Sequence, residues 1–145
     1  MAASDIVEEN KRLAQQFSEY AWSERFDDLR GICTPDAVVH DPAFGPEGTD
    51  IDGFIDYFEQ LHTAWSDADT QMIDVVAEGD YVFYRKRIEA THTGEFMGVA
   101  PTNRRITIEE HIEIRIEDGK VAETWAQYDS MGLMYQIGVE IPGSA

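Results

Sequence analysis

Apolar residues in the first 65 positions recur at the three- to four-residue spacing of an amphipathic α-helix. This spacing predicts a first helix capped by Ser4 or Asp5, a short helix over 26–33 and a third helix over 54–65 capped by Asp50 or Asp52. The third helix has the clearest pattern, because one face carries five apolar residues and a histidine: Phe54, Ile55, Phe58, Leu61, His62 and Trp65.

After Thr70 the apolar period changes from helical spacing to two, which is typical of β-strands. Strands are predicted over 72–77, 81–92, 105–116 and 121–129, in addition to a short earlier strand over 37–41. A tight hairpin turn is expected at 117–120, and a last helix over 130–137. Helices that precede a run of strands favour the α+β class, a curved antiparallel sheet packed with N-terminal helices into a cone with a pocket. At 145 residues, we expect residues 1–145 to form a single domain.

The longest isoleucine run raises the question of which strand face lines the pocket. Ile106, Ile108, Ile112, Ile114 and Ile116 alternate along one face, interrupted only by Glu110, while His111 belongs to the opposite face. The isoleucines can pack inward against the helices, which leaves His111 on the surface. Alternatively they pack against a second subunit, and the face of His111 lines the cone. We favour the second arrangement because both faces of the last strand are apolar, which suggests an oligomer.

The charge balance narrows the possible partners. Asp and Glu number 29 against 11 Lys and Arg, for a net charge of −18. Such a field repels nucleic acid and anionic lipid. Acid excess with only three lysines favours adaptation to a high-salt cytoplasm, although a merely solubilising acidic surface fits as well. We expect a cytoplasmic protein, because no membrane span or secretory signal is recognisable.

Several side chains are candidates for chemistry or binding. Asp129 follows Trp125 by four residues, and a carboxylate near aromatic rings should have the raised pKa that proton transfer needs. The residues alone nevertheless favour Asp129 as the cap of the final helix, which starts directly after it. His111 and His92 can orient a carbonyl or move a proton, or be hydrogen-bonded structural residues. His40 belongs either to a turn or to the pocket rim. The histidines lack metal-ligand spacing, and the single cysteine, Cys33, is expected to be a buried apolar residue.

One connection is much more elaborate than a hairpin needs. Thr91–Arg105 contains two glycines, a proline, a histidine and two arginines. Together with Val39–Pro42, Arg115–Lys120, Trp125 and Asp129, this segment resembles the SnoaL-like polyketide cyclases of the nuclear transport factor 2-like superfamily.

The resemblance implies cofactor-free acid/base catalysis of an intramolecular aldol ring closure, or of a related isomerisation, on a small, largely apolar or aromatic carbonyl compound, without a metal. Its catalytic acid would match Asp129, with His111 as the partner for the substrate oxygen. The pocket walls would be formed by Phe58, Trp65, Phe96 and Trp125, with His40 and His92 as further substrate contacts. The alternatives are a non-catalytic small-molecule-binding domain or a dimerisation domain, because one fold serves many functions. A homodimer is the default assembly for either reading.

Overall fold

The computed structural model describes residues 2–140 and 142 and contains four helices and one five-stranded sheet. The elements follow in the order α1 (Ala3–Trp22), α2 (Phe26–Gly31), β1 (Cys33–His40), α3 (Ile51–Ala64), β2 (Asp69–Glu78), β3 (Tyr81–Thr91), β4 (Arg105–Glu117), β5 (Lys120–Tyr128) and α4 (Ser130–Gln136). The predicted α+β class is therefore confirmed, and every expected element is present.

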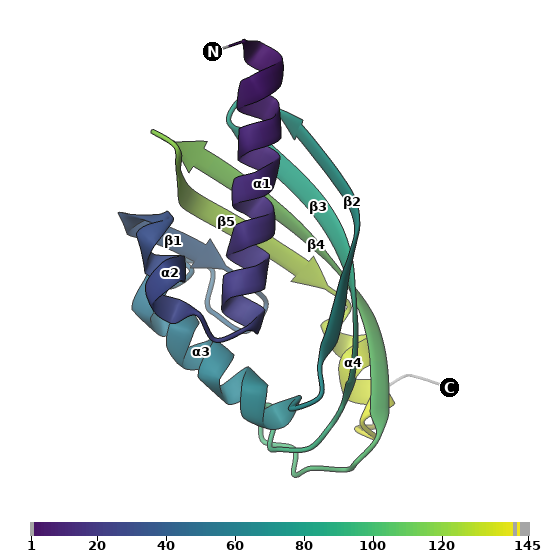
Figure 1. The fold of residues 1–145 in the computed structure, drawn as a ribbon. Helices are drawn as coiled ribbons and strands as arrows, with labels where there is room; N and C mark the ends of the chain where they lie inside the picture. The colour runs from purple at the N-terminus through teal and green to yellow at the C-terminus, as the bar shows by residue number, and fades with distance from the viewer. Residues whose placement is uncertain (1, 141, 143–145) are drawn as a thin grey trace.

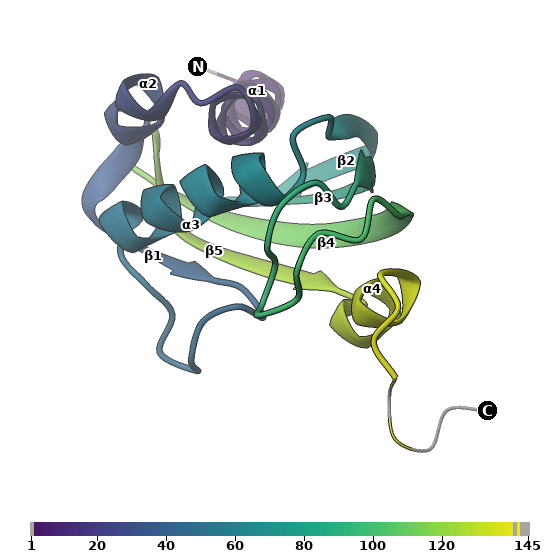
Figure 2. The ribbon, with the colours of Figure 1, turned by 90° about the horizontal axis from the view of Figure 1, so that it is seen from below.

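The sheet has the strand order β1-β5-β4-β3-β2 and bends around the helices (Figure 1). Neighbouring strands are antiparallel except that β1 runs parallel to β5. Seen from below, α1, α2 and α3 all cover the same side of the sheet, and α4 lies where β5 ends (Figure 2). This arrangement is the predicted cone, with its interior between the helices and the sheet.

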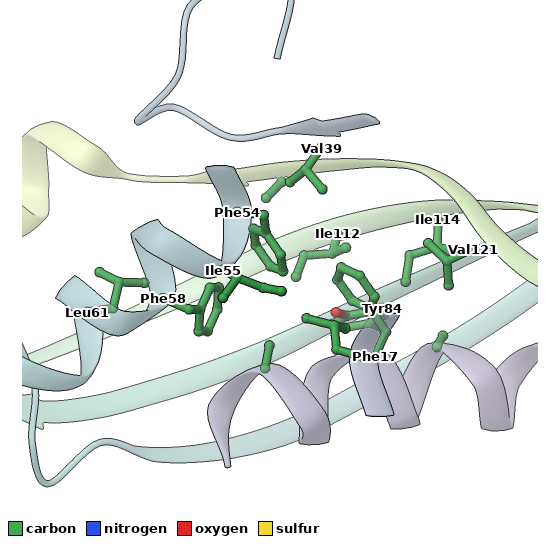
Figure 3. Packing of buried hydrophobic residues seen from close by; sticks show 14 of the residues in the cluster. Phe17, Val39, Phe54, Ile55, Phe58, Leu61, Tyr84, Ile112, Ile114 and Val121 are labelled. Atoms are coloured by element: carbon green, nitrogen blue, oxygen red, sulfur yellow. The ribbon is translucent and has the colours of Figure 1, made fainter. Parts of the chain in front are cut away.

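The core lies between α1, α3 and the inner face of the sheet (Figure 3). Phe17 of α1 stacks on Phe54 of α3, with 5.5 Å between ring centroids. Ile112 and Ile114 of β4 pack into the same cluster. The expectation that the isoleucine face packs against a second subunit is therefore wrong. The helices cover this face within one chain, and His111 is exposed on the other face.

The local boundaries show how individual residues shape the elements. Asp50 caps α3 as predicted, because its Oδ1 accepts a hydrogen bond from the Gly53 amide at 2.9 Å. The cap predicted at Ser4 or Asp5 is wrong, since α1 already begins at Ala3 and has no side-chain cap. The turn between β4 and β5 has positive φ at both Asp118 and Gly119, as a two-residue hairpin turn requires.

The first strand begins earlier than predicted, at Cys33 instead of residue 37. The strand accommodates Pro35 because β1 lies at the sheet edge, where a residue without an amide proton is tolerated. Cys33 is buried, as expected of a small apolar residue, and burial raises the pKa of its thiol to about 12. No helix within the described residues is long and apolar enough to span a membrane.

Candidate active site

A cavity lies between the helices and the inner face of the sheet, and its volume is about 750 Å³ when the part open to solvent is included. Residues from every layer of the fold line it, among them Phe17, Trp22, Asp41, Phe54, Tyr57, Phe58, Trp65, Tyr84, Phe96, Ile106, Ile108, Glu110, Ile112 and Tyr128.

The walls of the cavity are mostly aromatic. Trp22 and Phe54 both meet Phe58 edge-on, with ring centroids 5.2 and 4.7 Å away. Phe96 comes from the loop between β3 and β4 and lies 5.1 Å from Trp65, measured between ring centroids. Rings in these arrangements provide flat apolar surfaces that suit a planar, largely apolar ligand.

The cavity approaches the surface between α3 and two loops. A shallow depression there is lined by Phe44, Thr49 and Met97, and shares Tyr57, Leu61 and Phe96 with the cavity. Phe96 is held by reciprocal backbone hydrogen bonds with Val99, at 3.0 and 2.9 Å. The elaborate loop therefore forms one side of the cavity mouth.

Glu110 is the single charged side chain in the isoleucine row of β4, and it lines the cavity. The loss of hydration raises the pKa of its carboxyl to about 7, although Lys86 lowers that pKa and Asp41 raises it further. Its side chain remains partly accessible because it faces the free space of the cavity. A carboxyl with a pKa near neutrality can both accept and return a proton at physiological pH.

Lys86 is buried beside Glu110. The two residues are direct cross-strand partners on β3 and β4, and Lys86 is 1% exposed. Its Nζ donates a hydrogen bond to Ser18 Oγ of α1 at 2.5 Å and lies 5.2 Å from the centre of the Trp22 ring. Burial lowers the pKa of this amine, and the negative charge of Glu110 opposes that shift.

A second polar group lies on the other side of Glu110. Tyr128 is the cross-strand partner of Glu110 on β5, and Tyr57 of α3 and Asp41 line the same cavity. Asp41 accepts a hydrogen bond from the Ala43 amide at 2.9 Å, yet burial raises its pKa. The Tyr128 hydroxyl is buried without a hydrogen-bond partner within the described chain.

The residues predicted from the sequence fall into two groups. Phe58, Trp65 and Phe96 line the cavity as expected of its walls. By contrast, Asp129, His111 and Trp125 surround a shallow depression on the outer face of the sheet. Asp129 also caps α4, because its Oδ1 accepts a hydrogen bond from the Gly132 amide at 2.8 Å.

The two remaining histidines do not line the cavity. The ring of His40 stacks on Trp125 at 5.5 Å between centroids, and its Nε2 lies 2.7 Å from a Glu123 carboxylate oxygen. His92 is fully buried behind Trp65, and its Nδ1 accepts a hydrogen bond from the Thr102 amide at 3.2 Å. His92 therefore anchors the two ends of the loop that carries Phe96.

The polar groups of the cavity were not recognised from the sequence. One available signal was Glu110 itself, a lone carboxylate in an apolar row, which marks either a bulge or a functional position. Asp41 also belonged to a motif already noted, His40-Asp41-Pro42. Among residues 2–140 and 142, no three His, Cys, Asp or Glu side chains come together as a metal-binding group.

Comparisons with known proteins agree with this architecture. AclR from Streptomyces galilaeus, a candidate hydroxylase, is 27% identical over 91% of this chain and 97% of its own, with a TM-score of 0.78. IdmH from Streptomyces antibioticus, a candidate polyketide cyclase, is 28% identical over 90% of this chain and 99% of its own, with a TM-score of 0.77. A candidate SnoaL-like polyketide cyclase from Jannaschia sp. CCS1 shares the fold, with 22% identity, 97% and 99% coverage and a TM-score of 0.83.

No curated protein matches the chain. The family model described as SnoaL-like polyketide cyclase matches residues 11–137, which include the cavity and every strand of the sheet. The chain therefore belongs to the SnoaL-like polyketide cyclase family and has the nuclear transport factor 2-like fold that the sequence predicts.

Proposed function

We propose that this protein is a cofactor-independent enzyme that moves a proton at the carbon next to a carbonyl group, with Glu110 as the catalytic base and acid. The observation that carries the proposal is the position of Glu110, a carboxyl with a pKa near 7 inside an aromatic-walled cavity. The family membership supports an intramolecular aldol ring closure as the full reaction.

The chemistry requires one carboxyl group that changes its protonation state twice. The Glu110 carboxylate removes a proton from the α-carbon of a ketone, and the electron pair of that C–H bond forms an enolate. The enolate carbon then attacks a second carbonyl of the same molecule, which forms the new C–C bond and an alkoxide. Glu110 returns its proton to that alkoxide, so no oxidant, reductant or leaving group is needed.

The surroundings of Glu110 suit both halves of this cycle. The Lys86 ammonium stabilises the Glu110 carboxylate, the form that accepts the proton, and so lowers its pKa. The apolar surroundings raise that pKa, so the carboxylate remains basic enough to remove a proton. Aromatic surfaces on α1, α3 and the Phe96 loop can hold a flexible chain folded. Ordering two reacting carbons accounts for a large share of the barrier to ring closure.

This proposal places the catalytic role on a different residue from the one that the sequence suggested. Asp129 and His111 belong to the outer face, where water competes for both side chains. Glu110 faces the cavity. The two assignments make opposite predictions for the same assay, so mutation can separate them.

A suitable assay is the exchange of the α-protons of 2-tetralone, a bicyclic ketone, followed by proton NMR in heavy water. Wild-type protein should accelerate the exchange above the buffer rate, and Glu110→Gln should slow it by about 100-fold or more, the usual contribution of a positioned base. His111→Asn and Asp129→Asn should each retain the wild-type rate. Exchange that survives Glu110→Gln but disappears in Asp129→Asn would overturn the proposal.

The buried amine of Lys86 allows a competing route that must be tested in the same experiment. A lysine can catalyse exchange by forming an imine with the ketone. Sodium borohydride would reduce such an imine and add the mass of the ligand to Lys86. We expect no such adduct. An adduct together with exchange in Glu110→Gln would assign the chemistry to the lysine.

A further inference from the structure

The hydroxyl of Tyr128 is a hydrogen-bond donor for which the described chain supplies no acceptor. The atom is buried, and Tyr128 lines the cavity. Buried polar groups in folded proteins almost always have a partner, because an unpaired one loses its hydration without compensation. A bound ligand with an acceptor oxygen would supply the missing partner.

The neighbour of this hydroxyl strengthens that interpretation. Tyr57 projects from α3 into the same cavity, and its hydroxyl interacts with that of Tyr128, which raises the pKa of Tyr57 and lowers that of Tyr128. The contact does not meet the geometry of a hydrogen bond, so the Tyr128 hydroxyl still lacks a full partner within the described chain. Burial raises the pKa of Tyr128 to about 12 and that of Tyr57 beyond it. Both phenols therefore keep their protons at physiological pH and can act as donors.

The charge around the two phenols decides which ligand they can accept. Asp41 and Glu110 both face this part of the cavity. A carboxylate or phosphate ligand would be repelled by these acidic groups. A hydrocarbon would leave the donors unpaired. A neutral carbonyl oxygen accepts two hydrogen bonds and carries no charge.

The position of Glu110 connects this subsite to the reaction. Directly opposite residues on antiparallel strands have Cβ atoms about 5 Å apart, and Glu110 and Tyr128 are such a pair. The α-carbon of a ketone is bonded to the carbonyl carbon. Both phenols line the cavity with Glu110 and are close enough for its charge to raise their pKa values, so a ketone whose oxygen is bound by the phenols can present an α-proton to Glu110.

We propose that the hydroxyls of Tyr57 and Tyr128 form a subsite for the oxygen of a neutral, enolisable ketone whose α-proton is presented to Glu110. The inference rests on the proposed function for the role of Glu110, but the binding itself does not need the reaction. The same two donors would stabilise the negative charge that develops on this oxygen when the enolate forms.

The experiment compares 2-tetralone with tetralin, which has the same rings without the oxygen. Calorimetry should show that wild-type protein binds 2-tetralone about five-fold or more tightly, the effect of one net hydrogen bond. The infrared carbonyl stretch of bound 2-tetralone should lie below its value in cyclohexane. Tyr128→Phe should reduce the preference and move the stretch toward the cyclohexane value, with a smaller change for Tyr57→Phe.

The controls separate this subsite from a general packing effect. Tyr128→Phe retains the ring, so its affinity for tetralin should not change, and its melting temperature should be equal or higher because an unpaired hydroxyl is removed. Tyr81→Phe removes an exposed hydroxyl from β3 and should change neither ligand. Equal wild-type affinity for both ligands, or an unchanged carbonyl stretch in Tyr128→Phe, would overturn the inference.

The outcome also distinguishes this inference from the proposed function. Glu110→Gln should retain the infrared shift although it loses proton exchange. An infrared shift that depends on Tyr128, without any exchange, would leave the subsite valid and the enzyme proposal wrong. Proton exchange that depends on Glu110, together with a carbonyl stretch that does not change in Tyr128→Phe, would support the enzyme proposal and overturn the subsite.

Discussion

Replacing Lys86 by methionine tests whether the buried ammonium sets the protonation of Glu110. Methionine is close in length and apolar, so it fills the space between Ser18 and Trp22 without a charge. With the charge removed, Glu110 keeps its burial and the repulsion from Asp41 but loses the one group that lowers its pKa. The pKa of Glu110 must therefore rise.

The size of the change follows from the strand geometry. The Cβ atoms of direct cross-strand partners lie about 5 Å apart. If the two charges are taken to have the same separation, they interact by about 3 kcal/mol at an effective dielectric constant of about 20. One pH unit corresponds to 1.36 kcal/mol, so the Glu110 pKa should move from about 7 to about 9. At pH 7 the ionised fraction would fall from about one half to about 1%, and the exchange of 2-tetralone protons should slow by about 50-fold. The rate should recover above pH 9.

The same variant makes a prediction about stability. A carboxyl whose folded pKa lies above the unfolded value of about 4.3 favours folding fully below that value, and this contribution is lost as the pH rises through the folded pKa. In the wild type, this stabilising contribution of Glu110 should disappear as the pH rises through about 7, whereas in Lys86→Met it should persist until the pH rises through about 9. Urea unfolding between pH 5 and 10 measures this difference.

The assay combines exchange rates from pH 5 to 10 with a carbon-13 NMR titration of the Glu110 carboxyl. Lys120→Met is the matched control, because it removes an exposed lysine at the start of β5. It should change neither the pH dependence of the exchange rate nor the titration of the Glu110 carboxyl. If the Glu110 pKa in Lys86→Met stays within half a pH unit of the wild-type value, the electrostatic reasoning is refuted. Faster exchange at pH 7 would refute it too.

Three further predictions concern the rest of the molecule. Asp129→Ala removes the cap of α4 and should lower the unfolding free energy by about 1 kcal/mol in urea titrations, with 2-tetralone exchange unchanged. Because the net charge is −18, the midpoint of thermal unfolding should rise between 0.05 and 2 M NaCl, and a flat or falling curve would contradict the high-salt interpretation. If the chain is a homodimer, the exposed apolar pair Phe83 and Val76 on the outer face, 42% and 60% exposed, marks the expected interface, and Phe83→Glu should yield monomers in sedimentation experiments where Tyr81→Phe does not.

The helices and strands could be predicted because their signals are local. The 3.6-residue spacing on α3 and the two-residue spacing on β4 record which positions share a face, and this information lies within a few residues. The caps were less certain. Asp50 was a correct candidate, whereas Ser4 and Asp5 were not, since a helix end is determined by the few hydrogen bonds that form there.

The site was only partly predictable. Phe58, Trp65 and Phe96 were expected as walls because of the family resemblance, and all three line the cavity. Asp129 had a cap and a catalytic role as open alternatives, and the structure shows the cap. The polar group was missed because its members are distant in sequence: Ser18, Asp41, Tyr57, Lys86, Glu110 and Tyr128.

The sequence alone determined the class of fold, the order of the elements and the family resemblance, since these depend on periodicity and short motifs along the chain. Only the tertiary structure decided that the row of Glu110, and not the row of His111, faces the cavity. Alternation along a strand divides residues into two faces but carries no sign that says which one is inside. That choice depends on where α1 and α3 cover the sheet, and the same packing brings the Lys86 ammonium and the Tyr128 hydroxyl to either side of one carboxyl.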